Sequence, residues 1–160
     1  MQTLYVMCGV PASGKTTFSK QLAETYGLTR FSYDEMRCFD LRDLMKPTIK
    51  ALEEGQNVIV DNVNNRISGR KQILNYVLDI SCKKILIFMD TSLEECIKRN
   101  SFRQYPLPDY FINGIHHALQ PPTLDEGWDE IIVINNDEDI ESYIKNLNLF
   151  GGDDKLCLKL

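Results

Sequence analysis

Short apolar runs alternate along this chain with longer segments in which apolar residues recur every three or four positions. Runs of the first kind are typical of buried β-strands, and segments of the second kind are typical of amphipathic helices. The predicted strands cover residues 4–8, 29–32, 57–61, 84–89 and 130–134. The predicted helices cover residues 15–26, 42–54, 69–78 and 93–102, and Gly27 and Gly55 follow two of them as stop signals.

This alternation predicts an α/β domain, in which a five-stranded parallel sheet is covered by helices on both faces. We find no repeat or linker before Gly151, so residues 1–150 are predicted to form one domain and residues 151–160 a C-terminal tail. Ligands of open parallel sheets bind beyond the carboxyl ends of the strands. The residues that follow each strand are therefore the first place to look for chemistry.

Composition narrows the class of protein. The net charge of −5 argues against a protein that coats nucleic acid through a large basic surface, although a local basic groove is compatible with it. The five cysteines are scattered without a C-x-x-C pair, which is typical of reduced intracellular thiols. We see no signal segment and no apolar run long enough to cross a bilayer, so we expect a cytoplasmic protein that does not bind membranes.

The strongest motif follows the first predicted strand. Residues 9–16 read Gly-Val-Pro-Ala-Ser-Gly-Lys-Thr, a full match to G-x-x-x-x-G-K-[ST], and a predicted helix starts directly after it. Such a loop surrounds phosphates with backbone N–H groups, while its lysine reaches the β- and γ-phosphates and its hydroxyl binds Mg²⁺. The predicted ATP-binding residues here are Gly9, Ala12, Ser13, Gly14, Lys15, Thr16 and Thr17, with Thr16 also a metal ligand and Lys15 also catalytic.

The second strand is followed by candidates for acceptor binding. Asp34 lies at its carboxyl end and Arg37 three residues later, so on a starting helix they would share a face. A carboxylate can orient and deprotonate an acceptor hydroxyl, and an arginine can hold an anionic acceptor. The alternative is an N-cap aspartate beside an exposed arginine. Glu35 is expected to face solvent.

The third strand turns abruptly polar at its end. Asp61 is a candidate to hold a magnesium-bound water, and Asn62 and Asn64 are candidates to contact the acceptor, although an Asx turn would also explain them. Arg70, on the next helix, is a further candidate for acceptor binding. A solvated helix face shared with Arg66 is the alternative for that arginine.

The helix after the fourth strand carries Arg99 and Arg103, four residues apart, before Pro106 and Pro108 interrupt the helical pattern. Two arginines on one face of a helix that ends in such a connection predict a lid over the transferring phosphates, with Arg103 in a catalytic role. Ion pairs with Glu94 or Glu95 on a surface helix are the alternative.

Together these motifs resemble the kinase domain of the polynucleotide 5′-hydroxyl kinases, of the bacteriophage and the animal kinase/phosphatase types. The resemblance covers about residues 4–136. It includes the loop at residues 9–17, D-x-x-R at 34–37, D-N-x-N at 61–64, R-N-x-x-R at 99–103, and P-T-L-x-E-G-W at 122–128. It implies a P-loop sheet with strand order 2-3-1-4-5, and ATP and Mg²⁺ as cofactors.

By this resemblance Asp34 is the general base on the 5′-hydroxyl, Arg37 grips the neighbouring backbone phosphate, and Arg99 and Arg103 contact the ATP phosphates. Val63 stands where the family usually has threonine, and no D-x-D-G-T phosphatase motif occurs. We therefore expect transfer of the ATP γ-phosphate to the 5′-hydroxyl of a DNA or RNA strand. A P-loop kinase of a small molecule or nucleoside, and a nucleotide-binding regulatory module, are the alternatives.

Overall fold

The computed structural model describes residues 1–135 and Ile144. The predicted C-terminal tail at residues 151–160 lies outside the described residues, as does the end of the predicted domain. Within the described part, the β-strands are β1 (Gln2–Cys8), β2 (Thr29–Ser32), β3 (Val58–Asp61), β4 (Cys82–Asp90) and β5 (Glu130–Asn135). The helices are α1 (Lys15–Tyr26), α2 (Leu41–Glu53), α3 (Ile67–Tyr76), α4 (Leu93–Ser101) and α5 (Asp109–His117), with a 3₁₀ turn at Leu124–Glu126.

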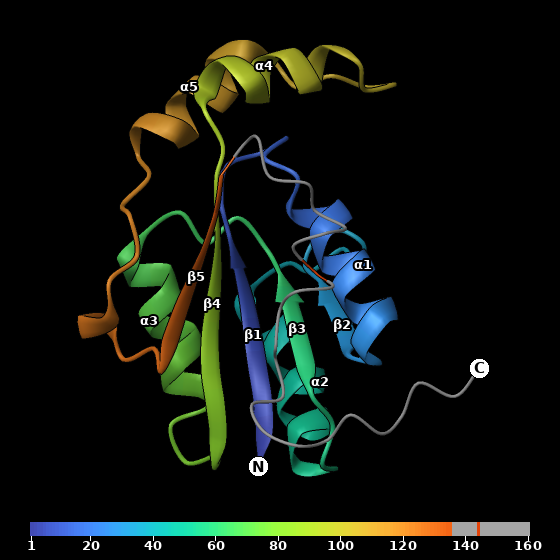
Figure 1. The fold of residues 1–160 in the computed structure, drawn as a ribbon, viewed down its shortest axis with the longest axis vertical. Coiled ribbons are helices and arrows are strands. Elements are labelled where there is room, and N and C mark those ends of the chain that lie inside the picture. Colours follow the sequence, from blue (N-terminus) through green and yellow to red (C-terminus); the bar gives the residue numbers. More distant parts are fainter. Residues whose placement is uncertain (136–143, 145–160) are drawn as a thin grey trace.

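The strands form a five-stranded sheet in the order β2-β3-β1-β4-β5, and all neighbouring strands pair in parallel. The α/β class and the strand order predicted above are therefore confirmed. Parallel neighbours require crossover connections, and the helices between the strands supply them. All carboxyl ends of the strands thus meet at one edge, under α4 and α5 at the top of Figure 1.

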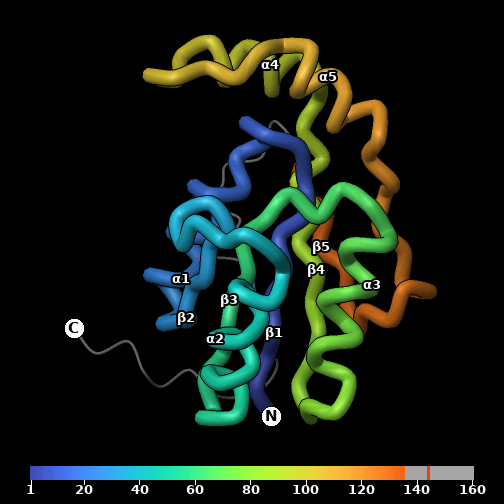
Figure 2. Tube along the Cα trace, turned by 180° about the vertical axis from the view of Figure 1, so that it is seen from behind, coloured from blue at the N-terminus to red at the C-terminus, as the bar shows by residue number. Residues whose placement is uncertain are grey.

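Side chains of β1 alternate between the two faces of the sheet, as a pleated strand requires. Leu4, Val6 and Cys8 belong to one buried cluster, which α2 and α3 complete. Tyr5 and Met7 belong to the other, with Phe18 and Leu22 of α1 and with Ile144. Figures 1 and 2, which view the molecule from opposite sides, show α1 on one face and α2 and α3 on the other.

Helix α5 was not among the helices predicted from the sequence. Helix α4 ends at Ser101, and α5 begins directly after its N-cap Pro108, a position at which proline is readily accommodated. Val10, Cys96 and Ile112 form a third buried cluster that packs α4 and α5, which together we call the lid, against the loop after β1. None of the helices in the described part of the chain is long and apolar enough to span a membrane.

Candidate active site

The loop between β1 and α1 is curled by residues in left-handed backbone conformations. Ala12 has φ 65° and Gly14 has φ 98°. Gly14 is also the N-cap of α1, where it has no side chain to cap the helix. The free N–H groups of the first helical turn, and the partial positive charge of the helix, therefore remain for an anion.

A glycine is required at position 9, where the loop begins. Its φ is +153°, and an added Cβ would lie 2.8 Å from Ser13 Oγ and 3.1 Å from the backbone oxygen of Met89. Its N–H donates to the carbonyl of Val63 at 3.0 Å, which ties the loop to the end of β3. Gly9 thus packs the loop against β3 and β4 and is not among the residues that line the pocket.

Lys15 is 8% exposed, and its Nζ donates to the carbonyl of Val10 at 2.8 Å. Burial lowers the pKa of Lys15 to about 8. Ser13 Oγ is also buried and accepts or donates no hydrogen bond among the described residues. A buried ammonium without a fully compensating anion, beside an unsatisfied hydroxyl, fits the phosphates of a nucleotide.

The pocket at the carboxyl edge of the sheet encloses about 460 Å³. It joins three parts of the chain: the loop after β1, the ends of β2 and β3, and the lid. Its lining residues are Pro11, Ala12, Gly14, Lys15, Thr16, Thr17, Asp34, Asp61, Asn62, Val63, Arg99, Arg103, Leu107, Phe111 and Ile115. Ten of the predicted site residues are in this lining, whereas Gly9, Ser13, Arg37, Asn64 and Arg70 are not.

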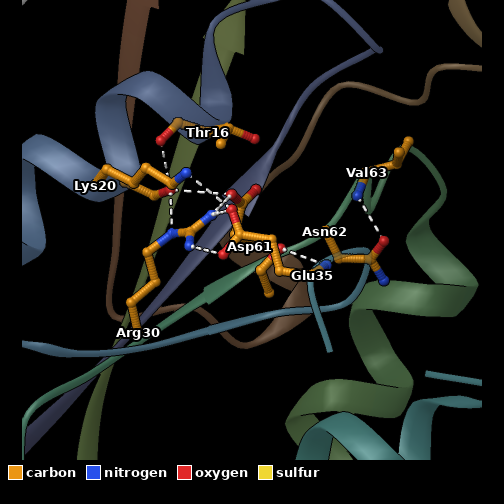
Figure 3. Close-up of polar contacts among 9 residues, drawn as sticks. Thr16, Lys20, Arg30, Glu35, Asp61, Asn62 and Val63 are labelled. Atoms are coloured by element: carbon orange, nitrogen blue, oxygen red, sulfur yellow. Dashed lines mark hydrogen bonds and ion pairs between the residues drawn. The ribbon is translucent and has the colours of Figure 1, made fainter. Parts of the chain in front are cut away.

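Asp61 is held by two donors that sequence reasoning did not connect with it. Arg30 Nη2 lies 2.6 Å and Ser19 Oγ 3.0 Å from Asp61 Oδ2 (Figure 3). Arg30 Nη1 also reaches Glu35 Oε2 at 2.8 Å. The register of β2 and β3, which pairs Ser32 with Asp61, explains this proximity, and no pattern in the sequence indicated it.

These contacts alter the ionisation of the groups involved. Burial alone lowers the pKa of Arg30, but its hydrogen bonds to Glu35 and Asp61 outweigh that effect and raise the pKa above its usual value. Hydrogen bonds from Arg30 and Lys20 hold the pKa of Glu35 below its usual value. Glu35 is exposed, as expected, and it also pairs with Lys20 at 3.0 Å and with Arg30 at 2.8 Å.

A magnesium ion would find few protein ligands here. Thr16 and Asp61 line the pocket, and the described residues contain no group of three or more His, Cys, Asp or Glu side chains that could hold a metal. Mg²⁺ keeps several waters and is commonly bound by one or two protein oxygens together with substrate phosphates. Thr16 and Asp61 fit that pattern.

Asp34 and Arg37 do not share a helix face, contrary to prediction. Residues 33–37 form a turn, and the φ of Arg37 is 53°, which is incompatible with a right-handed α-helix. The turn is closed by Met36 N donating to Ser32 O at 3.0 Å and Arg37 N donating to Asp34 O at 3.1 Å. Asp34 therefore lines the pocket, while Arg37 lies on an exposed turn outside the lining.

The two asparagines after β3 have different positions. Asn62 lines the pocket, and its Oδ1 accepts from Val63 N at 2.8 Å. Asn64 is 9% exposed and has φ 48°, and its Nδ2 donates to Met7 O at 2.8 Å. Asn64 thus stabilises a left-handed turn against β1 and does not face the pocket.

Arg70 is neither on a solvated face nor in the pocket. It is fully buried, and it pairs through Nε with Glu126 Oε2 at 2.7 Å and through Nη2 with Oε1 at 2.6 Å. Trp128 Nε1 donates to the same carboxylate at 3.1 Å. The P-T-L-x-E-G-W stretch therefore anchors α3 in the core, and Arg70 is not positioned to bind an acceptor.

Arg99 makes an ion pair of the kind that the surface-helix alternative predicted, and it also lines the pocket. Arg99 Nε pairs with Glu95 Oε1 at 2.9 Å, and Arg99 Nη1 donates to Ser13 O at 3.2 Å. Arg99 and Arg103 both line the pocket. Asn100, 1% exposed, fixes the connection to α5 through two hydrogen bonds with the backbone of Leu107, at 2.7 and 3.0 Å.

Comparison with known proteins agrees with this geometry. A family model described as an AAA domain matches residues 4–122. The chain is 28% identical over 135 residues to the bifunctional polynucleotide phosphatase/kinase of Schizosaccharomyces pombe, covering 81% of this chain and 33% of that protein. It is 27% identical over 146 residues to the L-seryl-tRNA(Sec) kinase of Methanococcus maripaludis, covering 79% of this chain and 56% of that protein.

The chain thus spans about a third of the first relative and just over half of the second. Among solved structures, a sugar kinase from Janibacter sp. HTCC2649 superimposes with a TM-score of 0.73 at 19% identity, over 91% of each chain. The family model covers most of the chain. The chain therefore belongs to this family of P-loop domains, and it has the fold and the phosphate-binding loop of the P-loop kinases.

Proposed function

We propose that this protein transfers the γ-phosphate of ATP, with Mg²⁺, to the 5′-hydroxyl of a nucleic-acid strand. The observation that carries the proposal is that Asp34 lines the same pocket as Lys15, Thr16 and Arg103. A carboxylate opposite a phosphate-binding loop suits attack by a hydroxyl group. In the transfer, Asp34 takes the hydroxyl proton, the acceptor oxygen bonds to the γ-phosphorus, and the bond from that phosphorus to the bridging oxygen breaks to release ADP.

Different residues of the pocket would stabilise the negative charges of the phosphates and of the transferring group. Lys15 and the N–H groups of the loop would hold the phosphates, and Arg103 would stabilise charge on the transferring group. Thr16 would coordinate Mg²⁺ directly, and Asp61 would hold one of its waters. When bound, Mg²⁺ neutralises charge on the β- and γ-phosphates.

The apolar side chains that line the pocket support a nucleic-acid acceptor. Leu107, Phe111 and Ile115 of the lid line it, together with Val63. An apolar and aromatic wall favours a nucleobase, which stacks on aromatic side chains, over a free sugar, whose hydroxyls require polar partners. Arg37 would bind the phosphate next to the terminal nucleoside, and the two relatives described above are named for a polynucleotide and for a seryl-tRNA.

The test is transfer of labelled phosphate from ATP to 5′-hydroxyl DNA and RNA oligonucleotides, with nucleosides and sugars as competing acceptors. Asp34→Asn should lower kcat by roughly 10²- to 10⁴-fold, the usual contribution of a general base, and leave ATP affinity unchanged. Asp79→Asn is the matched control, because Asp79 is an exposed aspartate in the connection to β4 and is not in the pocket.

Arg37→Ala should weaken acceptors that carry a phosphate beside the terminal nucleoside by about 10- to 150-fold, the equivalent of about 1.5–3 kcal/mol. A nucleoside without that phosphate should be indifferent to the change. Equal effects on both acceptors would refute the role of Arg37.

A kinase of a small hydroxyl compound is the second candidate. The likeness in fold to a sugar kinase over 91% of each chain and the net charge of −5 favour it. Efficient phosphorylation of a neutral metabolite by the wild-type protein, with oligonucleotides ignored, would replace the first proposal by this one.

A further inference from the structure

Arg30 contacts three segments of the chain beside the pocket. Its side chain, 11% exposed, projects from β2 toward α1 and the end of β3 (Figure 3). Its Nε donates to Ser19 Oγ at 2.8 Å, its Nη2 to Asp61 Oδ2 at 2.6 Å, and its Nη1 to Glu35 Oε2 at 2.8 Å. One guanidinium thus contacts α1, the carboxylate at the end of β3, and the turn after β2.

Asp61 and Glu35 belong to segments with different roles in the proposed reaction. Asp61 lines the pocket beside Thr16, where the metal would lie, and Glu35 directly follows Asp34 in the turn that faces the acceptor. Asp61 makes its side-chain hydrogen bonds among the described residues through Oδ2, so Oδ1 is the oxygen available to the pocket. The contacts with Arg30 therefore leave that function intact.

Charge explains why a cation is needed at this place. Asp61 is 4% exposed, and Glu35 reaches the same guanidinium, so the two carboxylates are close neighbours. Without Arg30 they would repel one another, and Asp34 would add a third negative charge to the same strand ends. This repulsion would weaken the attachment of the turn to the end of β3, where the hydrogen bond from Tyr33 N to Asp61 O at 3.0 Å would remain.

We propose that Arg30 is a positioning residue: by bridging Asp61 and Glu35 it fixes the turn that carries Asp34 relative to the phosphate-binding loop. The functional part of this inference rests on the proposed phosphotransfer, whereas the fixing of the turn does not. Arg30 is not among the residues that line the pocket, so it acts through the two carboxylates.

Loss of the contact with Asp61 should have a larger effect than loss of the contact with Glu35. The pair with Asp61 is almost fully buried, and the Asp61 carboxylate would lose its counter-charge with Arg30. Glu35 is 49% exposed and also pairs with Lys20 at 3.0 Å, so solvent and a second cation compensate a loss on that side. Arg30→Gln should therefore disturb the turn more than Glu35→Gln does.

The first readout requires no activity. Amide hydrogen exchange of residues 33–37 in the ligand-free protein should accelerate several-fold in Arg30→Gln, and less in Glu35→Gln, as local openings become easier. ATP affinity, measured by equilibrium binding, should stay within about twofold, because no phosphate-binding group is removed. Arg42→Gln is the matched control, since Arg42 also pairs with an aspartate, at 2.7 Å, but on the exposed start of α2.

The second readout is steady-state kinetics with the acceptor. Arg30→Gln should lower kcat by roughly tenfold, since misplacing Asp34 costs on the order of one decade in rate, and should raise the acceptor KM while the ATP KM stays unchanged. Arg30→Lys keeps the charge and should recover part of the loss. Adding Glu35→Gln to Arg30→Gln should produce no further loss, as expected for residues that act through one contact.

The outcomes are distinguishable. Unchanged exchange of the turn in Arg30→Gln would overturn the inference even if the wild-type protein proves to be a kinase. Absence of transfer by the wild-type protein to any acceptor would refute the proposed function, and the exchange measurement would still decide whether Arg30 fixes the turn. If Arg30→Gln does not fold, Glu35→Gln decides: faster exchange at residues 33–37 supports the inference, and unchanged exchange contradicts it.

Discussion

The buried pair of Arg70 and Glu126 allows a quantitative prediction for Glu126→Gln. This change keeps the size of the side chain but removes the counter-charge from a guanidinium that is fully buried, in a pair whose side chains are 0% and 3% exposed. Breaking one partner of a buried pair costs about 3–5 kcal/mol. Since 1 kcal/mol shifts Tm by about 2–4 °C in a chain of this length, we expect Tm to fall by about 6–20 °C.

Urea unfolding followed by tryptophan fluorescence measures this cost directly. Trp128 is the single tryptophan, and its Nε1 donates to the carboxylate that is changed. Glu130→Gln is the matched control, because Glu130 pairs with Lys83 at 2.7 Å while both side chains are 40% or more exposed. Such an exposed pair contributes about 0–1 kcal/mol.

The difference between wild type and Glu126→Gln should also depend on pH. Burial alone raises the pKa of Glu126, but hydrogen bonds from Arg70, Trp128 and Thr123 outweigh it and hold the pKa below its usual value. A carboxyl group with a depressed folded-state pKa stabilises the protein above its unfolded pKa, about 4.3. The difference should therefore be constant at neutral pH and shrink as the pH falls below about 4.3.

Two results would refute this reasoning. A loss of less than about 1 kcal/mol in Glu126→Gln would mean that the pair contributes no more than an exposed one. An Arg70→Met variant with normal stability but a raised acceptor KM would return Arg70 to the acceptor-binding role that the sequence suggested.

Three further predictions concern the nucleotide side of the pocket. Because burial lowers the pKa of Lys15 to about 8, ATP affinity should fall above that pH as the lysine deprotonates, by up to about tenfold per pH unit, and equilibrium binding to Lys15→Met should lack this dependence while remaining weak. Gly14→Ala should lower kcat much more than Gly27→Ala in steady-state assays. Both residues have positive φ, so each change should cost about 1–2 kcal/mol of folding stability. A Cβ at Gly14, however, would lie 3.3 Å from Arg99 Nη1, whereas one at Gly27 meets nothing within 4 Å. Arg103→Ala should lower kcat more than it raises the acceptor KM, and an unchanged kcat with both Arg99 and Arg103 removed would make them surface residues.

Much of the fold followed from local patterns. Strand β2 and helix α1 have the predicted bounds, and the other predicted elements differ at their ends by one or two residues, because hydrophobic periodicity reports burial better than it reports ends. Helix α5 was missed because two prolines precede it and only Ile112 is fully buried on it. Pro108, which directly precedes the first helical residue, was the signal that could have indicated a helix start.

The loop at residues 9–16 was determined by the sequence itself, because its glycines, lysine and threonine act through backbone conformation and fixed spacing within one short segment. Residues far apart in the chain were decided only by the tertiary structure. The register of β2 with β3 brings Arg30 to Asp61, and the packing of α3 buries Arg70 against Glu126. No local pattern distinguishes an arginine that is available to bind a phosphate from one that neutralises a buried carboxylate, since that difference depends on which charges the folded chain places beside it.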